Sequence, residues 1–294
     1  MKKYTYKKIN AFTWGMSQGN PAAYLMLGDD RLTENELLSI GKEHSGFVSE
    51  VVFCSNSDKA DCKLTYYSSE CEVDFCGHGT IATMYDVIKN DDILCNKKEV
   101  KFETNKKGIL TIYNHIATED SIYVTAPTAE YLKIPVSKEQ IAENLEIEVS
   151  MISEEYPIDF INAGLRTLIV PITHYNDEIS IFPNEAKLKD FCLSNVIDII
   201  LIFSKEASTS DFIAHTRVFA PKFGYLEDPA TGSGNSAFGN YMLKNQMWNG
   251  ESVSIEQGGE NILFNTVKLK KIEDKILFGG KARVSIEGFY CLER

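Results

Sequence analysis

A short glycine-containing segment occurs twice in this chain, about half a chain length apart. The letters CGHGT at residues 76–80 precede a compact, mostly apolar stretch, and the letters TGSGN at residues 231–235 precede another. Gly77 and Gly232 are 155 positions apart in a chain of 294 residues. A repeat of this length favours a duplicated half-domain over a short solenoid repeat. The alternative is two unrelated Gly-x-Gly turns.

The apolar pattern predicts alternating strands and helices. Capping boxes predict helices that start at Thr33 and at Ser137, and further helices are expected over 80–87, 184–192 and 236–243. Strands are expected at 3–12, 22–27, 51–54, 64–67, 100–104 and 109–113, and then at 122–125, 158–162, 168–172, 198–203, 212–219, 252–256, 262–267 and 282–286.

Charge and cysteine usage limit the partners and the compartment. The formal net charge of −12 argues against a nucleic-acid partner, although it leaves a small anionic substrate possible. No apolar stretch approaches the roughly 20 residues of a membrane span, and no signal peptide follows Lys2 and Lys3. The seven cysteines include no CxxC pair and no zinc pattern. We therefore expect a cytoplasmic protein with reduced thiols and no membrane partner.

The two glycine segments predict anion sites. A Gly-x-Gly turn before a helix leaves backbone N–H groups free at the positive end of the helix dipole, where a carboxylate can bind. Neither turn has the Lys of a P-loop, and neither matches the GxGxxG pattern of dinucleotide sites. His78 is the best proton shuttle among the candidates, which are Cys76, His78, Asp228, Thr231 and Ser233. The other histidines, which we expect to be surface or hydrogen-bonded residues, are His44, His115, His174 and His215.

Seven segments, in order along nearly the whole chain, resemble the PhzF-like family of phenazine-biosynthesis proteins. DPATGS at 228–233 resembles the family signature, and CGHGT at 76–80 is similar to its GHAT-type segment. Ser49-Glu50 before the strand at 51–54 resembles the SETxF segment. The remaining matches are GNPA at 19–22, GLR at 164–166, EQG at 256–258 and GGKA at 279–282.

The resemblance implies an α+β fold of the diaminopimelate epimerase-like type. Its two pseudo-symmetric halves are each a mostly antiparallel, β-barrel-like sheet around a central helix, and these helices would follow Gly79 and Gly234. We expect an N-terminal half at 1–118, completed by a C-terminal strand at 281–294, and a second half at 119–280. The active site would lie in the cleft between the halves.

The resemblance also implies the chemistry. Glu50 would be the catalytic acid/base, and His78 and Asp228 would assist it. Family members are cofactor-free isomerases, epimerases and racemases, often homodimers, so we expect no cofactor or metal, a homodimer and a role in a biosynthetic process. The substrate would be a small carboxylate, bound by residues of the two turns: Cys76, Gly77, Gly79, Thr80, Thr231, Gly232 and Ser233.

Two alternatives stay open. Two-thiol relatives carry a cysteine at each turn, whereas this chain has Cys76 at the first and Thr231 at the second. A threonine hydroxyl is too weak an acid to replace a thiol, which leaves a one-thiol racemase or epimerase using Cys76. The other alternative is a non-catalytic ligand-binding or interaction protein. The sequence also departs from the family in having no Arg at 261–266, after the EQG segment.

Overall fold

The computed structural model describes residues 1–293, which form two compact units. The first unit comprises Met1–Thr13, Gln18–Thr125 and the stretch that begins at Gly279. The second unit comprises Trp14–Ser17 and Ala126–Phe278. The first unit therefore continues to Thr125, whereas the sequence analysis placed the boundary after residue 118. The difference arises because the strand at Ser121–Thr125 pairs with a strand of the first unit.

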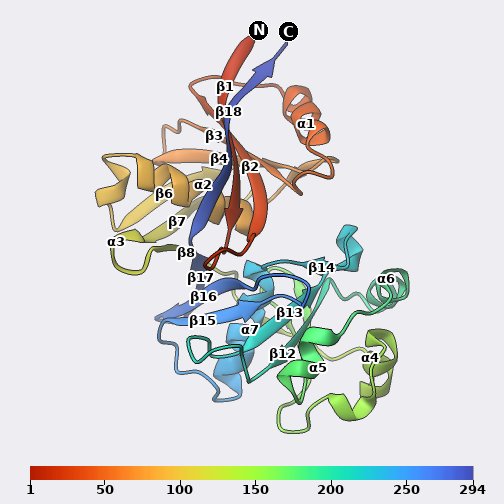
Figure 1. Cartoon of the computed structure of the whole chain (residues 1–294). Helices are drawn as coiled ribbons and strands as arrows, with labels where there is room; N and C mark the ends of the chain where they lie inside the picture. Colours follow the sequence, from red (N-terminus) through yellow and green to blue (C-terminus); the bar gives the residue numbers. More distant parts are fainter. Residues whose placement is uncertain (294) are drawn as a thin grey trace. The chain divides into compact units, whose positions relative to one another are not determined.

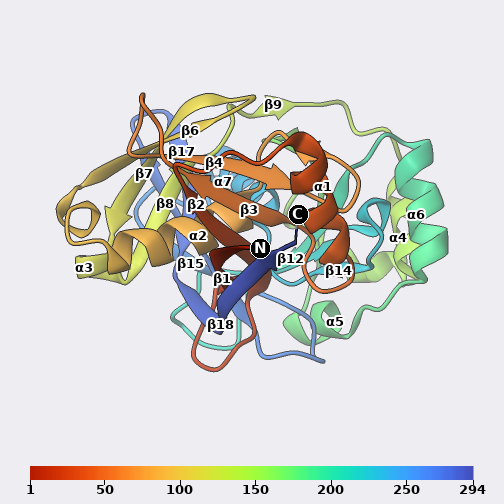
Figure 2. The same ribbon diagram turned by 90° about the horizontal axis from the view of Figure 1, so that it is seen from above.

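The first unit is a mostly antiparallel sheet around the helix α2 (Gly77–Asn90) (Figures 1 and 2). Its strands pair in the order β18–β1–β2–β3–β4–β6–β7–β8, with β5 beside β4, and only β2–β3 and β4–β6 are parallel. The other helices are α1 (Glu34–Glu43), α3 (Ile116–Glu119) and η1 (Leu94–Asn96). The strands are β1 (Lys2–Ala11), β2 (Asn20–Gly28), β3 (Val51–Ser55), β4 (Cys62–Tyr67), β5 (Glu72–Val73), β6 (Glu99–Thr104), β7 (Gly108–His115), β8 (Ser121–Thr125) and β18 (Ala282–Leu292).

The second unit repeats this plan around the helix α7 (Gly232–Lys244). Its strands pair in the order β9–β10–β11–β12–β13–β15–β16, with β14 beside β13. The strands are β9 (Glu130–Tyr131), β10 (Asp159–Asn162), β11 (Arg166–Pro171), β12 (Ile199–Ser204), β13 (His215–Phe219), β14 (Glu227–Asp228), β15 (Val253–Gln257), β16 (Asn265–Ile272) and β17 (Lys275–Gly280), which runs past the end of the unit. The other helices are α4 (Lys138–Leu145), α5 (Tyr175–Ser180), α6 (Glu185–Ser194), η2 (Val149–Met151) and η3 (Pro221–Phe223).

The pairing pattern supports a duplication. The parallel pairs β2–β3 and β4–β6 correspond to β11–β12 and β13–β15, and each central helix follows a two-residue strand, β5 or β14. The backbone angles at the two helix N-caps nearly coincide, with φ −121° and ψ 110° at Cys76 and φ −121° and ψ 108° at Thr231. Two unrelated turns would not share both the strand order and the cap geometry.

The central helices begin earlier than predicted. The sequence placed their starts at residues 80 and 236, but α2 begins at Gly77 and α7 at Gly232. The glycines therefore belong to the first helical turn. Both helices are largely buried, as their compact, mostly apolar sequences predicted. The capping boxes at Thr33 and Ser137 are confirmed, whereas α5 and β17 were not predicted.

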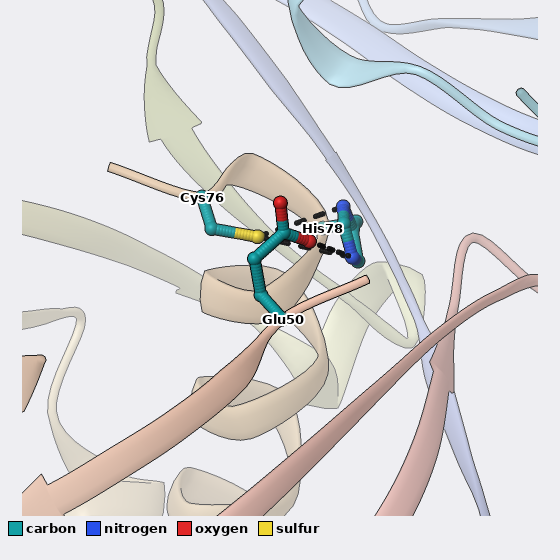
Figure 3. A group of neighbouring side chains, drawn as sticks. All are labelled: Glu50, Cys76 and His78. Atoms are coloured by element: carbon teal, nitrogen blue, oxygen red, sulfur yellow. Dashed lines mark hydrogen bonds and ion pairs between the residues drawn. The ribbon is translucent and has the colours of Figure 1, made fainter. Parts of the chain in front are cut away.

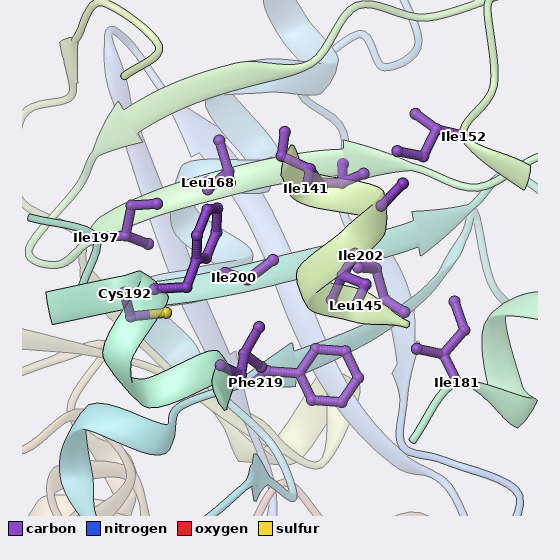
Figure 4. Close-up of a cluster of buried hydrophobic side chains, with 14 of the residues drawn as sticks. Ile141, Leu145, Ile152, Leu168, Ile181, Cys192, Ile197, Ile200, Ile202 and Phe219 are labelled. Atoms are coloured by element: carbon purple, nitrogen blue, oxygen red, sulfur yellow. The ribbon is translucent and has the colours of Figure 1, made fainter. Parts of the chain in front are cut away.

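A large apolar cluster fixes the second unit (Figure 4). It joins α4 and α6 to one face of the sheet through buried side chains such as Leu145, Leu188 and Ile200. Burial of such aliphatic side chains stabilises the fold by roughly 1.5–3 kcal/mol each. All seven cysteines lie outside disulfides, and no helix in the described range 1–293 is long and apolar enough to span a bilayer.

An ion-pair network fixes the start of strand β12. The Asp198 carboxylate accepts hydrogen bonds from the Arg166 backbone N–H (2.9 Å) and from Arg166 Nε (3.0 Å) and Nη2 (2.8 Å), and it also pairs with Lys222. Burial opposes ionisation of this carboxyl, but the hydrogen bonds from Arg166 and Lys222 outweigh it and lower the pKa of Asp198 to about 2.

We expect Asp198→Asn to lower the free energy of unfolding at pH 7 by about 2 kcal/mol, since the pKa is lowered from an ordinary value near 3.8. A carboxyl whose pKa is lowered in the folded state stabilises the fold at pH values above its ordinary pKa, and this stabilisation is lost as the pH falls through about 2. The difference in the free energy of unfolding between variant and wild type should therefore shrink on acidification. Urea unfolding over a pH series measures this. Asp190→Asn, on the exposed side of α6, is the control, and equal effects of the two substitutions would refute the assignment.

Candidate active site

Three side chains of the first unit converge at the start of α2 (Figure 3). Glu50 directly precedes β3, and Cys76 and His78 lie at the N-terminus of the helix. Glu50 Oε2 is 3.3 Å from His78 Nε2, and Cys76 Sγ is 3.6 Å from His78 Nδ1. The structure thus joins a carboxylate from one sequence motif with a thiol and an imidazole from another.

The first turn of α2 is tightly packed around Cys76. Cys76 is the N-cap, and its Sγ accepts a hydrogen bond from the Gly79 backbone N–H at 3.3 Å. The Thr80 hydroxyl donates to the Cys76 carbonyl at 2.7 Å and also hydrogen-bonds Tyr66. A Cβ at position 79 would lie 2.9 Å from Cys76 Sγ and from Val52, so only glycine fits. The Gly77 and His78 N–H groups, in the first turn, have no carbonyl acceptor within the helix.

The Glu50 side chain is largely buried and has no Lys or Arg ion-pair partner among the described residues. Its side chain is 20% exposed, and in the described part of the chain Oε2 is buried without a hydrogen-bond partner. His78 is its ion-pair partner at 3.3 Å, and Ser49 Oγ lies 3.3 Å from His78 Nε2. The N-terminus of α2, which is the positive end of the helix dipole, lies beside this carboxylate.

The equivalent position in the second unit is Asp198. Glu50 precedes β3, the second strand of the parallel pair β2–β3, and Asp198 precedes β12, the second strand of the parallel pair β11–β12. Asp198 is neutralised by Arg166 and Lys222, whereas Glu50 is paired with an imidazole. The equivalent positions of the two units therefore hold different arrangements. Asp198 is paired with two cationic side chains, and Glu50 is paired with an imidazole.

The turn residues of the second unit form a separate buried network. The Thr231 hydroxyl donates a short hydrogen bond to the Asp228 carboxylate, and both residues are buried. Gln257 Oε1 accepts from the Thr231 backbone N–H (3.0 Å) and from Asn235 (2.7 Å), while its Nε2 donates to the Asp228 carbonyl (2.9 Å) and to the Thr231 hydroxyl (3.1 Å). A single buried amide thus holds the turn.

Ser233 lies in the first turn of α7, next to Gly232. A Cβ at Gly232 would lie 2.4 Å from the Phe278 ring, so this glycine is required for close packing. The candidate residues therefore fall into two sets, one in each unit. The first set is Glu50, Cys76, Gly77, His78, Gly79 and Thr80, and the second is Asp228, Thr231, Gly232 and Ser233.

Some contributing residues had no assigned role in the sequence analysis. Ser49, Asn235 and Gln257 lay in segments that the sequence analysis singled out, so their motifs were visible, but Tyr66 carried no signal because its role depends on packing. His215 is fully buried, with Nδ1 3.1 Å from Glu178 Oε2. Burial raises the pKa of the Glu178 carboxyl, and the neighbouring His215 partly opposes this shift.

A buried guanidinium lies beside the segment where the sequence lacks an arginine. Arg217 pairs with both carboxylate oxygens of Glu227 at 2.9 Å and donates to the carbonyls of Glu178 and Ile179. A Cβ at Gly259 would lie 2.8 Å from Arg217 Nη2. Because its donors are used within the unit, Arg217 is a structural residue.

Comparison with known proteins identifies the family. The model of the family described as phenazine biosynthesis-like protein, PhzC-PhzF, matches residues 9–288. The chain belongs to this family. The uncharacterized isomerase YfhB of Bacillus subtilis is 30% identical over 292 residues, 98% of this chain and 96% of YfhB. Relatives from Clostridium acetobutylicum and Pseudomonas aeruginosa also carry the name isomerase, so this is an enzyme of an isomerase family.

Solved structures confirm the predicted fold class. The Bacillus anthracis phenazine biosynthesis protein of the PhzF family superposes with a TM-score of 0.86 at 27% identity, covering 99% of this chain and 100% of that chain. A hydroxyproline epimerase from Agrobacterium vitis shares the fold with a TM-score of 0.62 at 11% identity, covering 99% of this chain and 91% of its own. The α+β architecture of PhzF proteins and epimerases is therefore the fold of this chain.

We expect Gln257→Leu to lower the free energy of unfolding by about 3 kcal/mol, because it leaves buried donors and acceptors of the Asp228–Asn235 turn without partners. Urea unfolding measures the change. The control is Gln140→Leu on the exposed surface of α4, where only a capping-box hydrogen bond is lost and about 1 kcal/mol or less is expected. A loss at position 257 no larger than the control's would show that the amide does not hold the turn.

Proposed function

We propose that this protein is a cofactor-independent isomerase that moves a proton between two carbons of a small carboxylic acid, with Glu50 as base and then as acid. The observation that carries the proposal is the pairing of Glu50 with His78 at 3.3 Å, in a position where the duplicated unit holds a locked ion pair. A carboxylate that served only the stability of the fold would be stabilised most by an Arg or Lys side chain, as Asp198 is by Arg166 and Lys222.

The chemistry needs only groups of the chain. The Glu50 carboxylate removes a proton from a carbon next to an acidifying group, and the electron pair left on that carbon delocalises into the substrate. The protonated Glu50 then returns the proton to another carbon of the delocalised anion, so that no oxidant or reductant is consumed. A carboxylate whose side chain is largely buried suits both steps, because bulk water then competes less for the proton.

Backbone N–H groups support binding of a carboxylate substrate. The first turn of α2 directs the N–H groups of Gly77 and His78 away from the helix, where they meet the positive end of the dipole. Hydrogen bonds from such groups strengthen as negative charge develops on the substrate. We assign His78 as a positioning residue that orients the Glu50 carboxylate.

The second-unit turn is a further candidate for substrate contact. Asp228 accepts from the Thr231 hydroxyl, so Asp228 is oriented and Thr231 is committed as a donor. Gly232 and Ser233 present N–H groups in the first turn of α7, as Gly77 and His78 do in α2. We propose that this turn can bind a carboxylate group in the same way.

Glu50→Gln should reduce turnover by at least about a thousandfold, because the amide keeps the shape of the side chain but cannot carry the proton. The measurement is incorporation of solvent deuterium into a panel of small carboxylic acids, read by mass spectrometry. Thermal unfolding of the variant checks that it is folded. Near-full activity of a folded Glu50→Gln variant would refute the assignment, and lack of exchange by folded wild-type protein across a broad panel would favour the non-catalytic ligand-binding alternative.

A second candidate function is supported by the distance of 3.6 Å between Cys76 Sγ and His78 Nδ1. A thiol activated by this imidazole could act as the single acid/base of a racemase or epimerase. The structure gives Cys76 another use, since its Sγ caps α2 through the Gly79 N–H.

Cys76→Ser separates these two functions. Serine is a preferred N-cap residue, so the helix start is preserved, and we expect the variant to keep turnover within about tenfold of wild type. The readout is the same deuterium exchange, with Cys71→Ser at an exposed position as the matched control. A loss of a hundredfold or more in the folded variant would assign the chemistry to the thiol instead.

A further inference from the structure

The convergence of Glu50, Cys76 and His78 brings three different metal-ligating groups together. One carboxylate oxygen, one thiol sulfur and one ring nitrogen lie within 4.8 Å of one another, and within the described range 1–293 no other group of this kind occurs. Figure 3 shows the three side chains pointing toward a common point from β3 and α2. The proton-transfer reaction uses the carboxylate and does not require this combination.

The spacing fits a small tetrahedral ion. With Zn–S near 2.3 Å and Zn–N and Zn–O of about 2.0–2.2 Å, neighbouring ligand atoms of a tetrahedral zinc ion lie roughly 3.3–3.6 Å apart. The distance from Glu50 Oε2 to His78 Nε2 is 3.3 Å, Cys76 Sγ lies 3.8 Å from the same nitrogen, and the three ligand atoms all lie within 4.8 Å of one another. Small side-chain adjustments would therefore complete the ligand set.

A second observation points to the same site. Glu50 Oε2 is buried and accepts no hydrogen bond in the part of the chain that the structure describes, and its ion-pair partner there is the His78 ring nitrogen at 3.3 Å. A buried carboxylate oxygen that accepts no hydrogen bond is costly, and a metal ion bound between this oxygen and the imidazole would satisfy it. The thiolate and imidazole ligands favour a zinc-class ion over magnesium or calcium, which prefer oxygen ligands.

We infer that Glu50, Cys76 and His78 form a binding site for a divalent cation of the zinc class, and that its occupancy inhibits the enzyme. Three protein ligands leave the fourth position of the ion for water or another ligand. A metal ion bound to the Glu50 carboxylate occupies an oxygen lone pair that would otherwise accept the proton of the substrate. The inhibitory part rests on the proposed function, whereas the binding part does not.

The binding test uses the full-length chain with Co²⁺ and Zn²⁺ alone. In a variant in which the exposed cysteines Cys71, Cys95 and Cys291 are serine, we expect one equivalent of Co²⁺ to produce a thiolate-to-metal charge-transfer band. Adding Cys76→Ser should abolish the band and weaken Zn²⁺ binding by at least about a hundredfold, since loss of outer-shell partners alone costs 10–100-fold. Because serine keeps the helix cap, the variant should stay folded, and circular dichroism checks this.

Further variants assign the other ligands. Glu50→Gln and His78→Gln should each keep a thiolate band but weaken Zn²⁺ binding at least about tenfold. Absence of a band in the background variant, or its persistence after Cys76→Ser, would overturn the site. Zn²⁺ should inhibit the wild type, and a chelator should restore activity. A Glu50→Gln variant with full turnover but a weakened metal site would refute the proposed function and leave the metal site standing.

Discussion

The burial of the first turns of α2 and α7 is the constraint on which the rest of each unit depends. A buried helix start has N–H groups that its own backbone cannot satisfy. In the first unit the Cys76 thiol accepts a hydrogen bond from the Gly79 N–H, and in the second unit the Gln257 amide oxygen accepts one from the Thr231 N–H. Glycine at 79 and 232 is required because the neighbouring side chains leave no room for a Cβ.

Duplication makes the two units comparable, and the comparison reveals their specialisation. The acid that precedes the second strand of the first parallel pair is Glu50 in one unit and Asp198 in the other. Arg166 and Lys222 fix Asp198 in its ionised form, which serves stability. Glu50 has an imidazole and no lysine or arginine among its ion-pair partners in the described residues, and this is the setting that we propose for proton transfer. The same backbone position thus places a carboxylate in two different settings.

The turn residues show the same divergence. Position 76 is an N-cap thiol that accepts a hydrogen bond from its helix, whereas the equivalent N-cap Thr231 makes no side-chain capping hydrogen bond and donates its hydroxyl to Asp228. Position 78 is a titratable imidazole, and its counterpart is Ser233. The carboxylate that we propose for proton transfer and the imidazole beside it both lie in the first unit. This asymmetry agrees with one acid/base residue and argues against a symmetric pair of thiols.

The sequence by itself determined the family, the duplication, both capping boxes and the motifs that contain Glu50, His78 and Asp228, because these are signals of local order and spacing. It could not fix where α2 and α7 begin, since Gly-x-Gly is ambiguous between a turn and a helix start. Only the tertiary structure decided which side chains share a site. Glu50 meets Cys76 and His78 because β3 and α2 pack together, and Asp198 meets Arg166 because β11 and β12 pair. Such long-range contacts come from packing, which the order of residues along the chain does not display.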